Sequence, residues 1–293
     1  MQAYQTTVAA AAMLEGVGVH SGAPVRMTIR PALADTGIVF VRTDLAGDNR
    51  IPATVDTVSA TMLATVIANG AGASVSTVEH LMATFAGLGV DNAIVEVDAP
   101  ETPILDGSAA DFAAAIDGAG VADLASPRRF LEILAPIQVT GPGKRAALSP
   151  ADRFEMSVEI VFGASAIGRQ RIDVAVDAAS FRAELAGART FGFIAEVEQL
   201  RAAGYGRGAN LDNTIVVDGD RLLNPGGLRC PDEFVRHKAL DALGDLSLLG
   251  APILGRYESS CGGHALNNAL ARAVLAQPEA WRYVTADTSA APT

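Results

Sequence analysis

The chain has 293 residues, a formal net charge of −11 and 49% hydrophobic residues. This composition provides core material for one large domain or two of moderate size, and it carries no signature of disorder. The acidic charge argues against nucleic acid as a partner, and no apolar run approaches the roughly 20 residues that span a bilayer.

The cysteines and the amino terminus bear on the compartment. Cys230 and Cys261 lack the close spacing of a zinc finger, so they favour a reducing cytosol over a disulfide framework. The first basic residue is Arg26, so the mildly apolar start of the chain lacks the charged region of a signal peptide. We therefore expect a cytoplasmic protein without a transmembrane segment, and we expect it to act as a monomer.

The first half of the sequence predicts strands and then helices. Runs of β-branched residues, bounded by glycine, aspartate, asparagine or proline, are typical of strands. They occur at Val25–Pro31, Gly37–Thr43, Met62–Ala68 and Ala93–Val97. Helices are expected over Thr77–Leu88 and Ser108–Asp117, where a serine precedes an acidic residue by three positions.

A turn-forming stretch from Asp117 to Pro127 marks a boundary, and the second half repeats this order. Strands are expected at Phe130–Val139, Phe154–Val161, Ile172–Val176 and Thr214–Val217, and helices at Ala179–Ala186, Ala195–Ala203, Asp232–Leu249 and His264–Gln277. Two α+β halves of similar size suggest a duplicated architecture. We predict a first domain over residues 1–126 and a second over residues 127–293.

Three of the four histidines lie in settings that suggest chemistry. His80 follows a carboxylate, Glu79; His237 precedes Asp241 by one helical turn; and His264 follows two glycines. Two imidazoles and one carboxylate are the ligand set of a catalytic zinc that keeps a fourth position open. A further glutamate and a further histidine would supply acid–base chemistry, so the pattern indicates a metal-dependent hydrolase between the two halves.

Each of these residues also has a structural interpretation. His237 and Asp241 fit an ordinary surface pair on one helix face. Glu79 fits a capping box with Ser76, and His80 fits a satisfied core histidine. His264 fits the first turn of a helix after a Gly-Gly turn. Spacing alone leaves both interpretations open, and His20, in a glycine-rich turn, has no assigned role.

Only two of the 22 basic residues are lysines, Lys144 and Lys238, and Lys238 follows His237 directly. The simpler explanation is a composition that favours arginine. The functional explanation is a compact positive charge placed beside an anionic substrate.

Longer motifs carry more weight than spacing. They are Gly16-Val-Gly-Val-His-Ser-Gly22, Ser76-Thr-Val-Glu-His-Leu-Met82, Asp98-Ala-Pro-Glu-Thr-Pro-Ile-Leu-Asp-Gly-Ser-Ala-Ala110, Ala188-Arg-Thr-Phe-Gly-Phe193, Glu233-Phe-Val-Arg-His-Lys-Ala-Leu-Asp-Ala-Leu-Gly-Asp-Leu246 and Gly263-His-Ala-Leu-Asn-Asn268. In this order, from about Gly16 to Val284, they closely resemble the UDP-3-O-acyl-N-acetylglucosamine deacetylases (LpxC), which catalyse the committed step of lipid A biosynthesis.

The resemblance implies roles that agree with the pattern of histidines. His80, His237 and Asp241 match the ligands of one catalytic Zn²⁺, with Fe²⁺ as the alternative metal in the cell. Glu79 matches the general base, and His264 matches the second catalytic group, which stabilises the oxyanion and protonates the leaving amine. Asp245 matches the carboxylate that orients this histidine, and Thr190 matches a hydroxyl that helps to hold the oxyanion.

The resemblance also implies how substrate is bound. Lys238 and Lys144 match contacts to the UDP portion, whereas Phe191, Met62 and Phe162 are expected to line the substrate site. The implied fold is α+β: two similar two-layer α/β sandwich domains with helical layers packed face to face, each with a small insert. The second insert, about residues 193–217, would form the passage for the 3-hydroxyacyl chain.

The expected activity is hydrolysis of the N-acetyl group of UDP-3-O-(3-hydroxyacyl)-N-acetylglucosamine to acetate and the free amine. Two alternatives stay open: a zinc hydrolase acting on another amidated sugar, and a non-catalytic metal- or nucleotide-binding module. One position departs from the family pattern, because Cys261 stands three residues before His264 where several relatives are expected to have a basic residue. Arg256 is a candidate to supply the missing phosphate contact.

Overall fold

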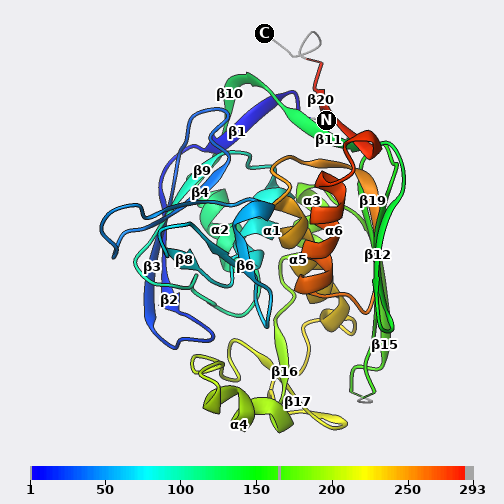
Figure 1. Ribbon diagram of the computed structural model, residues 1–293. Coiled ribbons are helices and arrows are strands. Elements are labelled where there is room, and N and C mark those ends of the chain that lie inside the picture. The colour runs from blue at the N-terminus through cyan, green and yellow to red at the C-terminus, as the bar shows by residue number, and fades with distance from the viewer. Residues whose placement is uncertain (1, 164–165, 288–293) are drawn as a thin grey trace.

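The computed structural model describes residues 2–163 and 166–287 as two sheets with helices between them (Figure 1). One sheet is built from the first half of the chain and the other from the second half. From left to right in Figure 1 lie the first sheet, the helices and the second sheet. The predicted α+β fold with helical layers face to face is confirmed, whereas the division after residue 126 stays a prediction.

The first sheet has five strands in the order β2-β3-β9-β4-β5. Their bounds are β2 Ala12–Val17, β3 Pro24–Arg30, β4 Ile38–Arg42, β5 Arg50–Pro52 and β9 Ala93–Val97. Strand β9 is central, antiparallel to β3 and parallel to β4, and every second side chain of it is buried. Helices α1 (Glu79–Leu88) and α2 (Ala110–Ala119) cover the inner face.

A separate two-stranded ribbon joins the start of the chain to its middle. Strand β1 (Tyr4–Val8) pairs antiparallel with β10 (Val121–Pro127). The stretch in which a boundary was predicted is therefore mostly a strand that pairs back onto the first half. None of its side chains is fully buried, so the strand lacks the alternating apolar residues from which a strand is predicted.

The second sheet has seven strands, with β19 (Ile253–Ser260) in the middle. Strand β19 pairs with β13 and β14 along its length and with β11 at its start. The remaining bounds are β11 Arg129–Ile133, β12 Ile137–Gly141, β13 Lys144–Ser149, β14 Phe154–Val161, β15 Arg169–Ala175 and β20 Trp281–Thr285. Helices α5 (Glu233–Ser247) and α6 (His264–Leu275) cover its inner face, beside α3 (Ala178–Ser180) and the π-helical turn η2 (Phe181–Leu185).

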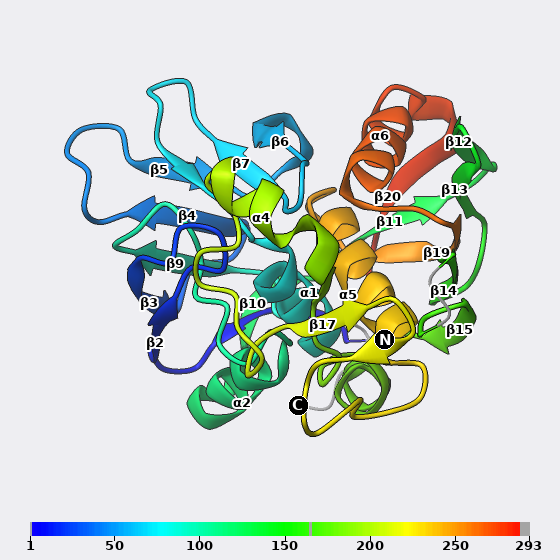
Figure 2. The ribbon, with the colours of Figure 1, turned by 90° about the horizontal axis from the view of Figure 1, so that it is seen from below.

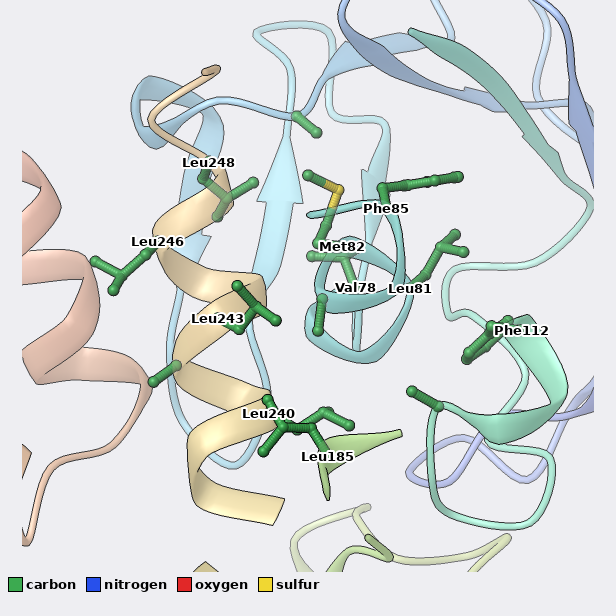
Figure 3. Packing of buried hydrophobic residues seen from close by; sticks show 14 of the residues in the cluster. Val78, Leu81, Met82, Phe85, Phe112, Leu185, Leu240, Leu243, Leu246 and Leu248 are labelled. Carbon is green, nitrogen blue, oxygen red and sulfur yellow. The ribbon is translucent and has the colours of Figure 1, made fainter. Parts of the chain in front are cut away.

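The two helical layers meet mainly where α1 packs against α5. Figure 3 shows Met82 and Leu243 pointing toward each other across this contact, while Leu246 points toward α6. Both helices are buried over most of their length. Gly244 makes the close approach possible, because a β-carbon at this position would overlap the backbone of Glu79.

Each half carries a small additional sheet. In the first half β6 (Val58–Ala60), β7 (Val66–Ala68) and β8 (Ser74–Val75) form one, preceded by the 3₁₀ turn η1 (Val55–Thr57). In the second half β16 (Phe191–Phe193), β17 (Ile215–Asp218) and β18 (Arg221–Leu222) form another, with α4 (Ile194–Ala202) between its strands. This second group lies at the lower end of the molecule in Figure 1 and in front of the central helices in Figure 2.

The second group also reaches the first half of the chain. The backbone amides of Arg207 and Gly208 donate to the carbonyls of His20 and Val19. The ring of Tyr205 stands edge-on to that of His20, with centroids 5.4 Å apart. The glycine-rich turn near His20 is therefore held against the segment in which an acyl passage was predicted.

Several predicted elements need correction. The strand expected at Met62–Ala68 begins only at Val66, since Leu63 has a positive φ of 65°. The strand expected at Phe130–Val139 is two strands, β11 and β12, separated by a turn containing Pro136. The 3₁₀ turn η3 (Pro278–Ala280) follows α6, which ends at Leu275 rather than Gln277. Among the described residues, no helix has the length and apolar character required to cross a bilayer.

Candidate metal centre

Three helices, α1, α5 and α6, carry the candidate metal ligands and the candidate acid–base residues. Glu79 and His80 are the first two residues of α1, and His264 is the first residue of α6. His237 and Asp241 lie one turn apart on the buried face of α5. The contact of α1 with α5 therefore brings residues separated by more than 150 positions into one cluster.

The three predicted metal ligands come together. The ligand atoms of His80, His237 and Asp241 all lie within 4.8 Å of one another. Asp241 Oδ1 is 3.6 Å from His80 Nε2 and 3.4 Å from His237 Nε2, and each residue is 2–3% exposed. The two imidazole rings stand at 89°, so their Nε2 atoms converge without stacking. This is the one group of three or more His, Cys, Asp or Glu ligands so arranged within residues 2–163 and 166–287.

The donor atoms in this cluster fit a divalent cation. Asp241 Oδ1 is buried and has no hydrogen-bond partner among the described residues, which is costly unless something positive binds it. The Nδ1 of His237 lies 3.0 Å from the carbonyl oxygen of Ala188, an interaction that directs the lone pair of Nε2 toward Asp241. Burial lowers the pKa of His237 to about 3, against the attraction of Asp241, so the ring is neutral as a metal ligand requires.

Lys238 occupies the other oxygen of Asp241. Its Nζ donates to Asp241 Oδ2 at 2.7 Å and lies 5.7 Å from the centre of the Phe191 ring. Burial alone would raise the pKa of Asp241, but His237 and Lys238 hold it well below its usual range. The carboxylate is therefore ionised, with one oxygen held by the lysine and the other facing the imidazoles.

Glu79 and His264 face each other beside this cluster. Glu79 Oε1 lies 3.9 Å from His264 Nε2, and Glu79 Oε2 accepts from the backbone amide of Thr65 at 3.0 Å. Burial raises the pKa of Glu79, although His264 and His80 partly oppose this shift. The alternative role of Glu79 in a capping box is wrong, because the residue before α1 is Val78 and no side chain caps the helix.

Asp245 fixes the ring of His264. The Nδ1 of His264 lies 2.9 Å from Asp245 Oδ2, and Asn267 Nδ2 donates to the same oxygen at 2.8 Å. Burial lowers the pKa of His264, but Asp245 and Glu79 raise it more, to about 9. The ring is therefore an imidazolium at neutral pH, with its Nε2 proton directed toward the cluster.

Sequence patterns did not reveal two members of this network. Tyr257, on β19, is fully buried and donates its hydroxyl to Asn267 Oδ1 at 2.6 Å. Asn267 lies one turn after His264 on α6, so the helical period from that histidine would have placed it beside Asp245. Tyr257 gives no such signal, because its position depends on the pairing of β19 within the sheet.

The segment that carries Thr190 is tied to α5. Glu233 is fully buried and accepts hydrogen bonds from the backbone and the guanidinium of Arg189. The amide of Thr190 donates to the carbonyl of Gly107 at 2.8 Å. These contacts place Thr190 between the two halves and put Phe191 next to His237, with ring centroids 6.2 Å apart.

The remaining residues predicted to contact substrate are Phe162, Met62 and Lys144. The ring of Phe162 is 5.7 Å from that of Phe191, so these two residues form one aromatic wall. Met62 is 62% exposed and lies in the same segment as Thr65. Lys144 is exposed and is the first residue of β13. The next residue, Arg145, pairs with Ser260 of the antiparallel strand β19, so Lys144 lies beside Cys261.

A cavity lies elsewhere in the described structure. It has a volume of about 580 Å³ and is lined by the carboxyl-terminal parts of α1 and α5, including Phe85 and Leu246. None of the candidate catalytic residues or metal ligands lines it. The donor geometry rather than cavity size therefore identifies the site.

Comparisons with known proteins identify a family for this chain. Residues 5–276 match the family described as LpxC: UDP-3-O-acyl N-acetylglycosamine deacetylase. The chain belongs to this family. Proteins named UDP-3-O-acyl-N-acetylglucosamine deacetylase are similar to it in Phenylobacterium zucineum (strain HLK1), with 59% identity over 96% of this chain and 97% of that protein, and in Myxococcus xanthus (strain DK1622), with 49% identity over 96% and 90%.

A third relative with the same name, from Shewanella sp. (strain W3-18-1), is 45% identical over 96% of this chain and 93% of its own length. The resemblance stated from sequence motifs is thereby confirmed at the level of the family. LpxC proteins are metalloenzymes, and the cluster of His80, His237 and Asp241 is the group of ligands that this chain offers to a metal.

Proposed function

We propose that this chain removes the N-acetyl group of UDP-3-O-(3-hydroxyacyl)-N-acetylglucosamine by hydrolysis, in the biosynthesis of lipid A. Membership of the family supports the reaction. The observation that carries the proposal is the unpaired, buried Asp241 Oδ1 between the Nε2 atoms of His80 and His237. Glu79 and His264 beside it provide a proton acceptor and a proton donor.

We propose Zn²⁺ as the resident metal, held by His80, His237 and Asp241, with Fe²⁺ as its alternative in the cell. Two imidazoles and one carboxylate suit both ions, and three protein ligands leave a position for a reactant. When bound, such an ion acts as a Lewis acid that makes water a stronger nucleophile and polarises a carbonyl group.

The residues of the chain account for the proton transfers. Glu79 accepts a proton from the attacking water, because its carboxylate lies beside the cluster and is held by the amide of Thr65. Water adds to the acetamide carbon, and the oxyanion formed is stabilised by the imidazolium of His264 and the hydroxyl of Thr190. His264 then gives its Nε2 proton to the glucosamine nitrogen, the C–N bond breaks, and acetate and the free amine leave.

The proposed substrate has an anionic end and an apolar end. We propose that Lys238 and Lys144 bind the UDP portion, since the whole chain is acidic and binding a diphosphate must rest on local cations. Lys238 also holds Asp241, so its replacement is expected to change both kcat and KM. Lys144 is exposed, so Lys144→Ala should raise KM alone, and Cys261→Lys beside it should leave KM unchanged or lower it.

We propose that the acyl chain runs along the insert at about residues 193–217, past Phe191, Phe162 and Met62. The neighbouring aromatic rings and the exposed side chains of Met62 and Ile194 support an apolar path there. We further propose that the protein works in the cytoplasm as a monomer with domains 1–126 and 127–293. Both cysteines are free, which supports a reducing compartment.

Acetate release from UDP-3-O-(3-hydroxyacyl)-N-acetylglucosamine, with acyl chains of several lengths, tests the proposal. Chelation should abolish the activity, one equivalent of Zn²⁺ should restore it, and excess should inhibit it because Glu79 and His264 offer a second set of ligands. A substrate without the acyl chain should react slowly. Equal rates with and without the chain would favour a hydrolase of another amidated sugar, and binding without acetate release would favour a non-catalytic module.

A further inference from the structure

Thr65 makes three contacts to the candidate catalytic residues or to the residue that precedes them. Its backbone amide donates to Glu79 Oε2 at 3.0 Å, and its hydroxyl donates to Asp245 Oδ1 at 2.6 Å. Its carbonyl accepts from the amide of Val78 at 3.4 Å. The residue is 2% exposed.

The hydroxyl of Thr65 completes the hydrogen bonding of Asp245. Asp245 Oδ2 is occupied by His264 and Asn267, so Oδ1 is the oxygen left to orient the carboxylate plane. A donor on each oxygen prevents rotation of the carboxylate about its last bond. The direction of the Asp245–His264 hydrogen bond, and hence the aim of the imidazolium, then depends on the hydroxyl of Thr65.

The amide of Thr65 acts in the same way on Glu79. It holds Oε2, which leaves Oε1 as the oxygen that faces His264 at 3.9 Å. One residue of the first half therefore positions the proton acceptor directly and the proton donor through Asp245 of α5. The main chain of Thr65 makes the contacts with Glu79 and Val78, whereas its side chain makes the contact with Asp245. A substitution of the side chain can therefore remove the contact with Asp245 and leave the other two in place.

We propose that Thr65 is a positioning residue that sets the relative geometry of the proton acceptor Glu79 and the proton donor His264. The inference rests on the proposed function, because it assigns a purpose to the geometry of that same site. A merely structural role would appear in stability or in the amount of metal-loaded protein. A positioning role appears in kcat of the folded, metal-loaded protein.

The test compares Thr65→Val with Thr65→Ser in acetate release. Valine keeps the shape and the backbone amide but removes the donor to Asp245, and serine keeps the donor. We expect Thr65→Val to lower kcat about tenfold to a hundredfold, the effect typical of residues that orient a functional group. KM should stay within about twofold and metal content near one equivalent, and Thr65→Ser should recover most of kcat.

A matched control is Thr7→Val. Thr7, on β1, is also a buried threonine, and its hydroxyl accepts a hydrogen bond from the backbone amide of Ala32. It should lose stability but keep kcat. If Thr65→Val does not give folded protein, Thr65→Cys provides a weaker donor of similar size, and kcat should fall in the order Thr, Ser, Cys. The proposal would be overturned if Thr65→Val kept the kcat of the wild-type protein. It would also be overturned if Thr65→Ser lowered kcat as much as the valine or cysteine substitution.

A double-mutant cycle separates this inference from the proposed function. In an Asp245→Asn background the added effect of Thr65→Val on kcat should shrink, because both changes disturb one interaction. Full additivity would mean that Thr65 does not act through Asp245. If the wild-type protein itself released no acetate, the proposed function would fail, and that result is distinct from any outcome with Thr65.

Discussion

Glu79 and His264 are the residues whose protonation should govern the rate. The mechanism requires Glu79 without a proton and His264 with one. Burial raises the pKa of Glu79, and carboxylates raise that of His264 to about 9 against the effect of burial. We therefore expect a bell-shaped profile of kcat/KM, which rises as Glu79 loses its proton and falls as His264 loses its own.

A divalent cation in the cluster stabilises the carboxylate of Glu79 and destabilises the imidazolium of His264, so it lowers both pKa values. Both limbs of the profile of the metal-loaded enzyme should therefore lie at lower pH than the metal-free site would give. Asp245→Asn should move the basic limb to lower pH, since it removes the carboxylate that most strongly raises the pKa of His264. Glu79→Gln and His264→Ala should each lose roughly 10²–10⁴-fold in rate. Their metal content should stay near one equivalent; loss of metal from either would identify that residue as a ligand.

Sequence motifs and spacing located the residues of the site better than they described their contacts. His80, His237, Asp241, Glu79 and His264 were named from the chain alone, and the fold brings them together. The contact of Lys238 with Asp241 was missed, although the two lie three residues apart on one helix. Thr65 and Tyr257 could not be found in this way, because their contacts depend on register and on the packing of α1 against α5.

At the scale of elements, the close approach of α1 and α5 rests on Gly244. A β-carbon here would lie 2.0 Å from the carbonyl oxygen of Glu79, much closer than van der Waals contact allows. This oxygen belongs to the backbone of the first residue of α1, so it cannot move aside as a flexible side chain could. We expect Gly244→Ala to cost about 1–3 kcal/mol of unfolding free energy, as overpacking does. It should also displace α5 relative to Glu79 and lower kcat about a hundredfold.

Gly118→Ala is the matched control, because Gly118 also lies inside a helix, α2, and a β-carbon there meets open space. It should stabilise the protein by about 0.4–1 kcal/mol, since alanine restricts the unfolded chain. Denaturant unfolding and acetate release, measured on both variants, provide the comparison. Equal effects of the two substitutions would show that the approach of α5 to α1 tolerates an added methyl group.

The sequence failed to predict strands in which apolar and polar residues alternate only weakly. In β19 the buried positions Ile253, Gly255, Tyr257 and Ser259 include a glycine and a serine, so period-two hydrophobicity is blurred. The start of β15 was missed for a similar reason, because Arg169, Gln170 and Arg171 are polar and the prediction began only at Ile172. Helices were easier to predict, since α1 and α5 carry apolar residues at helical spacing and their ends fall within a few residues of expectation.

At the scale of the whole molecule, the proposed ligands bridge the two halves: His80 comes from one and His237 with Asp241 from the other. A metal that binds only the folded state stabilises it by mass action, by about 2.7 kcal/mol at a free metal concentration of 100 times Kd. Tm should therefore rise on titration of Zn²⁺ into chelated protein, by about 2–4 °C for each kcal/mol. Lys144→Ala should keep this shift, and His80→Ala should lose most of it.

The fold class followed from the resemblance more than from local patterns, because two α+β halves with small inserts are a property of the whole chain. Composition alone excluded little beyond disorder and bilayer-spanning runs. The pairing of β1 with β10 could not be anticipated, since more than 100 residues separate the two strands and β10 has no buried residue that would mark it as a strand.

The place of β19 in the sheet has a consequence for the synthesis of the protein. The hairpins β12–β13 and β14–β15 are both made before residue 176, yet they join one sheet only through β19, which begins at Ile253. At roughly 5–20 residues per second, the ribosome needs several seconds to reach that strand. During this interval each hairpin presents an unpaired edge, so the demand of the nascent chain for chaperones is set by the late position of β19 rather than by the stability of the finished fold.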